Sequence, residues 1–196
     1  VTVTSPGLRG AEIALGDRHG ARQVQLARSP DAPAPSSLPP TADASFTGGV
    51  FSGFGSDFGV STTLPANMLD GDASTYWSNR YSKVQTQTLN AVTNARPEDW
   101  VSLSWAPAKQ IDQLQANFIT DANDELPATV TVYYRNGEDD WVPVTGQQVT
   151  FAGASNTPST ITFHPVTTTA LKLDMTSAAP YDPITGNLAI SELQIH

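Results

Sequence analysis

Apolar and polar residues alternate with a period of two in several short segments of the chain, a pattern that predicts β-strands. The apolar positions are Val101, Leu103 and Trp105, then Leu114, Ala116 and Phe118, and others within residues 130–134, 161–163 and 171–175. No segment carries a convincing apolar stripe with helical spacing over more than two turns. Many short strands at close spacing are typical of an antiparallel sandwich or barrel, so we expect an all-β fold.

The last predicted strand changes phase within its own length. Leu188 and Ile190 alternate, and the alternation resumes in the opposite phase at Leu193. One extra residue near Ser191 and Glu192 would account for this shift, which is how a β-bulge appears in a sequence. Because a bulge redirects a side chain, we expect it to reorient an acidic residue here.

The sequence divides into three parts. Residues 1–28 hold short alternating pieces that are too small to enclose a core, since an isolated hairpin is marginal in water. They are expected to be the last strands of a preceding β-domain, or an extension packed on the main one. Residues 29–42 form a linker, because five prolines within residues 29–40 favour extended polyproline II. Residues 43–196 form the main domain.

Composition excludes several classes of partner. The chain has 10 Lys and Arg against 19 Asp and Glu, a formal charge of −9. Nucleic acids and anionic membranes both require basic surfaces, so neither is an expected partner. No apolar run approaches the roughly 20 residues of a membrane span. The chain has no cysteine and does not begin with Met, and we expect it to be a piece of a longer polypeptide.

Oxygen-bearing side chains are densest in residues 67–77. Asp70 and Asp72 flank Gly71, and Thr75 follows, which gives the hard oxygen ligands that calcium prefers. An EF-hand is excluded, because its sixth and twelfth positions would be Thr75 and Tyr81 instead of Gly and Glu. Spacing alone favours a solvated turn over a cation site.

The same segment resembles a known family. The residues Asn67, Leu69, Asp70, Gly71, Asp72, Ser74, Thr75 and Trp77 resemble the signature of coagulation factor V/VIII type C (discoidin-like) domains. Among these, the bacterial carbohydrate-binding modules of family 32 are the most similar. The resemblance continues through residues 100–103, 111–114, 128–135 and 188–193, and covers roughly residues 43–196.

The resemblance implies a jelly-roll β-sandwich with a structural calcium between the Asp-Gly loop and the final strand. The implied ligands are the Asn67 carbonyl, the Asp70 carboxylate, the Asp72 carbonyl, Thr75, the Ser191 carbonyl and Glu192. The expected bulge would then turn Glu192 toward the cation. Residues 1–28 would be the end of an Ig-like domain.

Sugar binding in this family uses loops at one end of the sandwich, where an aromatic ring stacks on a pyranose and polar side chains read its hydroxyls. The candidate residues here are Ser78, Asn79, Arg80 and Tyr81, with Phe54 and Tyr181 from other loops. Many sugar-binding relatives carry a His where this chain has Ser78. Two alternatives stay open, a hydrophobic plug for the loop around Phe54 and a salt bridge for Arg80.

No catalytic constellation is recognisable. His19, His164 and His196 lie in unrelated contexts, and no nucleophile elbow is present. The four tryptophans lie along predicted strands and are expected in the core. The resemblance thus implies a non-catalytic carbohydrate-binding module with Ca²⁺, and we expect it to target a secreted bacterial glycoside hydrolase to galactosides or related glycans. The alternative is an accessory domain that packs on the upstream catalytic domain without binding sugar.

Overall fold

The computed structural model describes residues 2–3, 11–12, 38–48, 62–80 and 95–196. The chain divides into two units, residues 1–36 and 37–196. In the first unit, strands β1 (Thr2–Val3) and β2 (Ala11–Glu12) pair antiparallel. Within the described ranges, no helix has the length and apolar character needed to cross a membrane.

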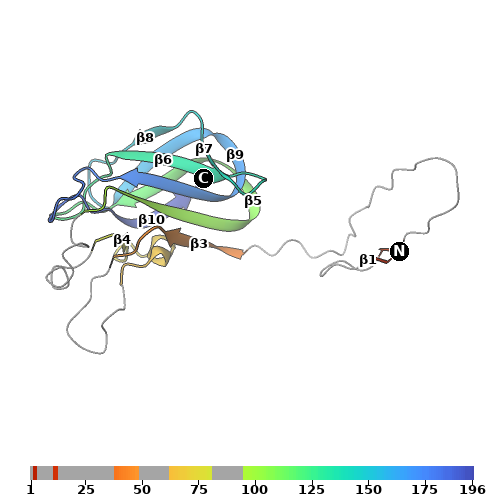
Figure 1. Ribbon diagram of the computed structural model, residues 1–196, viewed down its shortest axis with the longest axis horizontal. Helices are drawn as coiled ribbons and strands as arrows, with labels where there is room; N and C mark the ends of the chain where they lie inside the picture. The colour runs from red at the N-terminus through yellow and green to blue at the C-terminus, as the bar shows by residue number, and fades with distance from the viewer. Residues whose placement is uncertain (1, 4–10, 13–37, 49–61, 81–94) are drawn as a thin grey trace, which may run out of the picture. The chain divides into compact units, whose positions relative to one another are not determined.

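Nearly all of the regular secondary structure described in the second unit is antiparallel strand (Figure 1). Its ladder runs in the order β4-β10-β5-β9-β6-β7, with β3 added on β5 and β8 added on β9. A short 3-10 helix, η1 (Pro65–Leu69), precedes β4. The strands are β3 (Leu38–Ala44), β4 (Trp77–Ser78), β5 (Glu98–Phe118), β6 (Thr129–Arg135), β7 (Trp141–Pro143), β8 (Gln148–Thr150), β9 (Thr157–Thr176) and β10 (Ala189–Ile195).

Strands β5 and β9 run together through both layers of a sandwich. The first part of β5 pairs with β3 and with the end of β9, whereas its last part pairs with β10 and the start of β9. The register between β5 and β9 shifts between Ser104 and Lys109, where the paired strands pass from one layer to the other. The expected jelly-roll β-sandwich is confirmed. The two segments predicted around residues 101–105 and 114–118 are halves of one strand.

The core lies on the faces that the alternation predicted. The apolar positions of β5 and β9 are fully or almost fully buried, among them Val101, Leu114, Leu171 and Leu173. Trp77 and Trp105 are buried with them, as expected. The prediction is wrong for Trp100 and Trp141, which are only half-buried. Trp100 directly precedes the inward-facing Val101, so the pleat of β5 directs it to the outer face.

Strand β3 corrects the expected linker boundary. It begins at Leu38, so residues 38–42 belong to the sheet. Prolines have no N–H to donate to a ladder, and the register between β3 and β5 shifts between Leu38 and Thr41, around Pro39 and Pro40. Prolines are tolerated because, among the described residues, β3 pairs with β5 alone and forms an edge.

The β-bulge expected in the last strand is present. The register between β10 and β5 shifts between Ile190 and Glu192. Both Ser191 and Glu192 are buried.

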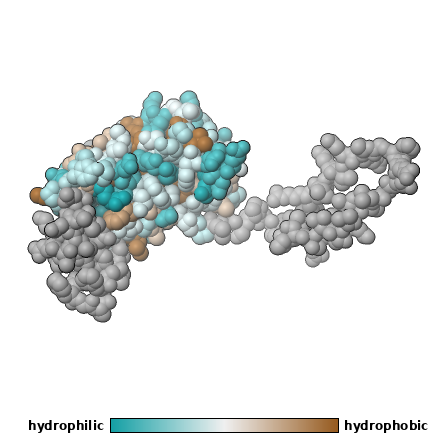
Figure 2. Space-filling view, viewed as in Figure 1, coloured by the Kyte–Doolittle hydropathy of each residue, from teal (hydrophilic) through white to brown (hydrophobic). Residues whose placement is uncertain are grey.

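On the face visible in Figure 2, the described surface is mostly hydrophilic, and its hydrophobic residues form separate spots.

Candidate functional site

Three connections leave the sandwich at the same end. Thr176, the last residue of β9, pairs with both Glu98 and Thr129, the first residues of β5 and β6. We call this region the loop end; its described part comprises residues 79–80, 95–97, 119–128 and 177–188. Backbone hydrogen bonds join these connections, including Asn79 N–H to the Leu188 carbonyl at 3.1 Å. The loop end is therefore tied together by its backbone.

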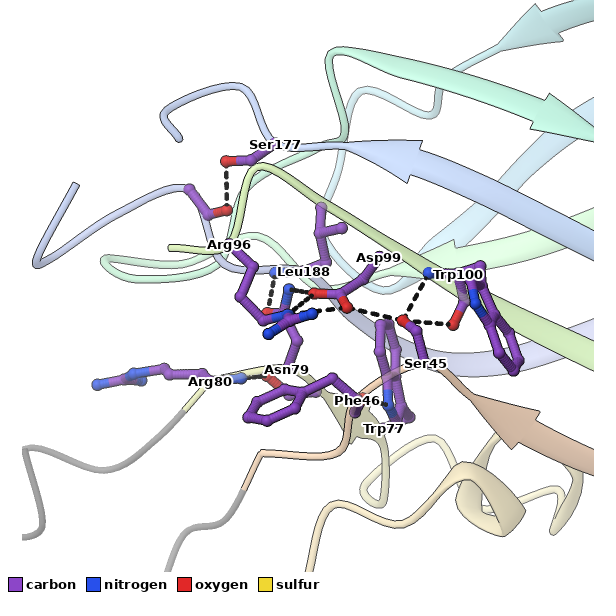
Figure 3. A network of polar contacts seen from close by, with 12 residues as sticks. Ser45, Phe46, Trp77, Asn79, Arg80, Arg96, Asp99, Trp100, Ser177 and Leu188 are labelled. Atoms are coloured by element: carbon purple, nitrogen blue, oxygen red, sulfur yellow. Dashed lines mark hydrogen bonds and ion pairs between the residues drawn. The ribbon is translucent and has the colours of Figure 1, made fainter. Parts of the chain in front are cut away.

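A buried carboxylate, Asp99, is the centre of a polar network next to the loop end (Figure 3). It accepts hydrogen bonds from the Asn79 amide at 2.9 Å and the Ser45 hydroxyl at 2.7 Å. The Arg96 guanidinium pairs with both of its oxygens at 2.9 Å and lies over the Phe46 ring, 4.4 Å from its centroid. The charge of Asp99 is thus compensated by three partners, which a buried carboxylate requires.

Two of the predicted sugar-contacting residues have structural roles instead. Asn79 is 4% exposed; its amide nitrogen bonds Asp99, and its oxygen accepts the Leu188 N–H at 2.8 Å. Ser78 is buried, and its hydroxyl accepts the Arg80 N–H at 3.1 Å. These polar groups are engaged inside the protein, where Ser78 and Asn79 position the loop.

Arg80 is half-exposed at the loop end, and its side chain extends away from the Asp99 network in Figure 3. Its positive charge acts on a group of acids. Burial raises the pKa of Asp124 to about 6, the neighbouring Asp121 also raises it, and Arg80 lowers it. Burial likewise raises the pKa of the Tyr76 phenol, with a further contribution from Asp124. The sequence offered Arg80 but gave no sign that Tyr76 and Asp124 would lie close to it.

Tyr181 is the most exposed aromatic residue of the described chain, at 67%. Its backbone has a φ of +67°, in the left-handed region, and its N–H donates to the Ala95 carbonyl at 2.7 Å. Asp182 stabilises the same loop by accepting the N–H groups of Ile184 and Thr185. The ring of Tyr181 therefore projects into solvent from an ordered turn. The candidates Phe54 and Tyr81 lie outside the described residues.

The Asp-Gly loop forms a second polar site. Thr75 Oγ1 donates to the Asp70 carboxylate at 2.6 Å, and the Asp72 N–H donates to the same carboxylate at 2.8 Å. The hydroxyl and N–H of Ser74 hold the pKa of Asp72 below its usual value. The side-chain nitrogen of Asn67 donates to the Thr62 and Tyr76 carbonyls. These bonds do not involve the Asn67 carbonyl, which is the expected cation ligand.

Glu192 brings the last strand to this loop. It is 8% exposed, and its Oε1 atom is buried without a hydrogen-bond partner in the described part of the chain. Burial raises the pKa of Glu192, the Asp70 and Asp72 carboxylates raise it further, and a hydrogen bond with the Gly71 backbone acts against them. A buried, unpaired carboxylate oxygen close to two other acids is the environment that a hard cation would stabilise.

Asn156 joins the two halves of this site and was missed as a site residue. Its amide nitrogen donates to the Ala73 carbonyl at 2.8 Å, and its amide oxygen accepts the Ser191 hydroxyl. Its backbone φ is +56°, a conformation that Asn tolerates better than most residues. No local pattern in the sequence pointed to the contacts of Asn156 with Ala73 and Ser191.

The donor set fits a hard cation rather than a transition metal. In the described part of the chain, no three His, Asp or Glu side chains gather in a way that could hold a metal. The candidate site depends on two carboxylates, from Asp70 and Glu192, together with hydroxyl and carbonyl oxygens. Calcium binds such mixed oxygen sets.

The two-layer sandwich with this loop-to-strand site defines a discoidin-like β-module. The family model for the F5/8 type C domain matches residues 55–190, more than half of the chain. The chain therefore belongs to the F5/8 type C domain family. Family membership agrees with the non-enzymatic character expected from the sequence. No curated protein sequence matches the chain significantly.

Several solved structures share the fold. A structure of the Streptococcus pneumoniae beta-galactosidase BgaA has 16% identity and a TM-score of 0.57, covering 80% of this chain and 90% of that chain. The family 32 module of Clostridium perfringens NanJ, solved with galactose, has 17% identity and a TM-score of 0.54, covering 81% and 96%. A pectin-binding carbohydrate-binding module has 24% identity and a TM-score of 0.51, covering 80% and 88%.

Proposed function

We propose that this chain is a non-catalytic carbohydrate-binding module whose loop end binds a glycan of the galactose type or a related sugar. It would target a secreted bacterial glycoside hydrolase, of which it is a part, to that glycan. Weak binding by such a module raises the local concentration of a tethered enzyme at its substrate. The named structural neighbours are consistent with this role, because they include a beta-galactosidase and a module in complex with galactose.

The observation that carries the proposal is the exposed ring of Tyr181 at the same end of the sandwich as the guanidinium of Arg80. A pyranose presents an apolar face that packs on an aromatic ring and a rim of hydroxyls that accept from a guanidinium. The exposed carboxylate of Asp121 adds an acceptor for the hydrogens of those hydroxyls. Tyr181 is held by the Ala95 carbonyl, so little ordering is needed when a sugar binds.

We also propose that the module holds a structural Ca²⁺ between the Asp-Gly loop and β10. Asp70, Asp72, Thr75 and Glu192, with the carbonyls of Asn67 and Ser191, would hold it. The cation would compensate the unpaired oxygen of Glu192 and fasten the first loop of the domain to its last strand. The orphaned Glu192 Oε1 supports this assignment.

A glycan array probed with the purified chain tests the function. We expect binding to galactosides or related glycans and loss of that binding in Arg80→Ala and in Tyr181→Ala. Leu64→Ala is the matched control, because Leu64 is exposed but lies next to η1, outside the loop end. If no glycan binds at millimolar concentration, or if the Leu64→Ala protein loses binding as much as the other two, the loop-end assignment is wrong.

A further inference from the structure

The outer face of the β3-β5-β9-β6-β7 layer has two hollows, and neither is lined by Arg80 or Tyr181 of the proposed loop-end site. One has a volume of about 470 Å³ and is lined by residues that include Trp100, Thr131, Tyr133 and Asp174. The other, of about 510 Å³, is lined by residues that include Ser102, Trp141 and Lys172, and again by Trp100. Both volumes lie in the range of small-ligand sites. The Trp100 side chain is therefore the element that the two hollows share.

The backbone of Trp100 is fixed by its neighbours. Its N–H donates to the Ser45 hydroxyl at 2.9 Å, and its carbonyl accepts the Ser45 N–H at 2.9 Å. The same Ser45 hydroxyl donates to the buried Asp99 carboxylate, which Arg96 clamps on the other side (Figure 3). Ser45 thus connects the backbone of Trp100 to the Asp99 network next to the loop end. A half-buried ring on a fixed backbone is a preorganised stacking surface.

The cations that line the two hollows are each paired with an acid. The Lys172 ammonium contacts both oxygens of Asp174 at 3.0 Å, and Asp174 lies directly across from Trp100 in the ladder. Arg96 pairs with Asp99, and Arg135 pairs with Asp139 at 3.0 Å. Glu98 and Asp43 also line the hollows as exposed carboxylates. The face therefore offers paired cations together with additional acidic acceptors.

Two of the aromatic rings are already covered by cations. The Lys172 ammonium lies 4.6 Å from the centroid of Tyr133 and 5.8 Å from that of Trp141. The Arg135 guanidinium lies 5.3 Å from the Trp141 centroid. The hydroxyls of Ser102, Ser104 and Thr131 line the floor beside these pairs. Trp100 is consequently the ring best placed to receive a ligand.

From this geometry we infer a second binding surface, on which a neutral oligosaccharide stacks a sugar ring on Trp100 and extends into the two hollows. Sugar hydroxyls both donate and accept, so they can bridge the Lys172–Asp174 pair and the serine and threonine hydroxyls. An acidic glycan would need unpaired cations, and the cations here are paired. A protein partner would favour a core depleted of charge, and this face has ion pairs beside Trp100.

Isothermal titration with neutral hexasaccharides (galacto-, xylo-, gluco- and mannohexaose) tests the inference in an Arg80→Ala background. This background removes the proposed loop-end site, so the two proposals succeed or fail separately. We expect at least one hexasaccharide to bind the Arg80→Ala protein, and the additional Trp100→Ala change to weaken it by about tenfold. Trp100→Phe should restore most of the affinity, because the phenyl ring keeps a stacking surface.

Two controls keep the result specific. Gln110 lies on β5 beyond the point where the strand crosses between layers, and it lines neither hollow. Gln110→Ala should therefore leave the affinity unchanged. Lys172→Met removes a donor without touching Trp100 and should also weaken binding, which covers the case in which Trp100→Ala disturbs folding. Absence of hexasaccharide binding to the Arg80→Ala protein overturns the inference. So does a Trp100-dependent dimer in sedimentation velocity, which would make this face a protein interface.

Discussion

The side-chain amide of Asn79, directly after β4, donates a hydrogen bond to the carboxylate of Asp99 in β5 over 2.9 Å. The amide oxygen of Asn79 accepts the backbone N–H of Leu188, just before β10. One side chain thus connects three segments that are far apart in the sequence. The partner carboxylate also holds Ser45 and Arg96, so both proposed sugar-binding surfaces rest on the same buried acid.

Replacing this acid should destabilise the whole domain. Asp99→Asn leaves the Arg96 guanidinium without its counter-charge and gives Asn79 and Ser45 a weaker acceptor. We expect a loss of about 3 kcal/mol in the free energy of unfolding, measured by urea denaturation. The control is Asp43→Asn, at an exposed position on β3, which should change stability by less than about 0.5 kcal/mol. Equal stability of the two variants would contradict the central role of Asp99.

The raised pKa of Asp124 predicts a pH dependence of stability. The pKa is about 6 in the folded protein and 3.8 for the free side chain. Between these values the folded state binds the proton more tightly than the unfolded state does. The stabilisation from protonated Asp124 is therefore complete below about pH 4 and is lost as the pH rises through about 6.

Asp124→Asn should remove this dependence. Between pH 4.5 and pH 7 the native protein should lose about 2 kcal/mol in its free energy of unfolding, because its buried carboxylate becomes charged. The Asp124→Asn protein has no such carboxylate, so its free energy of unfolding should improve by that amount relative to the native protein over the same range. Thermal denaturation of both proteins across this range measures the difference. A constant difference between the two pH values would show that Asp124 has an ordinary pKa.

The left-handed backbone of Asn156 and its two side-chain contacts predict different costs for two substitutions. Asn156→Ala loses the contacts with Ala73 and Ser191 and also places Ala at a φ of +56°, for a total of about 3 kcal/mol. Asn156→Gly loses the contacts but accepts the backbone, so it should cost about 1 kcal/mol less. Chemical denaturation compares them. If Gly is no better than Ala, backbone conformation is not part of the cost.

The proposed cation predicts that calcium stabilises the native chain through Glu192. At a concentration 100 times the dissociation constant, a bound ion adds about 2.7 kcal/mol to the free energy of unfolding. Calcium should therefore raise the melting temperature of the native protein and have much less effect on Glu192→Gln. Chelation should reverse the rise. If neither calcium nor a chelator changes the melting temperature of the native protein, the proposed calcium site is wrong.

The sequence was informative wherever a local pattern determined the outcome. Alternation identified the buried faces of β5 and β9, and the phase change at Ser191 and Glu192 identified the bulge. The same alternation could have directed Trp100 outward, because it lies out of phase with Val101. The linker boundary was placed too late, because Pro39 and Pro40 obscured a strand that tolerates them at an edge.

Contacts between distant segments were beyond local patterns. Asn79 was expected at a ligand, yet it bonds to Asp99, 20 positions later, and to Leu188, 109 positions later. Asn156 reaches Ala73 across 83 positions. The elevated pKa of Asp124 depends on burial that only the folded loops create. Such properties arise from which loops meet at one end of the sandwich.

The central claim, a sugar site at the loop end, is tested most directly by nuclear magnetic resonance. The labelled chain would be titrated with the glycan that binds it best on the array. The account predicts that amide shifts concentrate at Arg80 and in residues 121–125 and 180–185, and that they disappear in Tyr181→Ala. Shifts that avoid these residues, or that persist unchanged in the Tyr181→Ala protein, would contradict it.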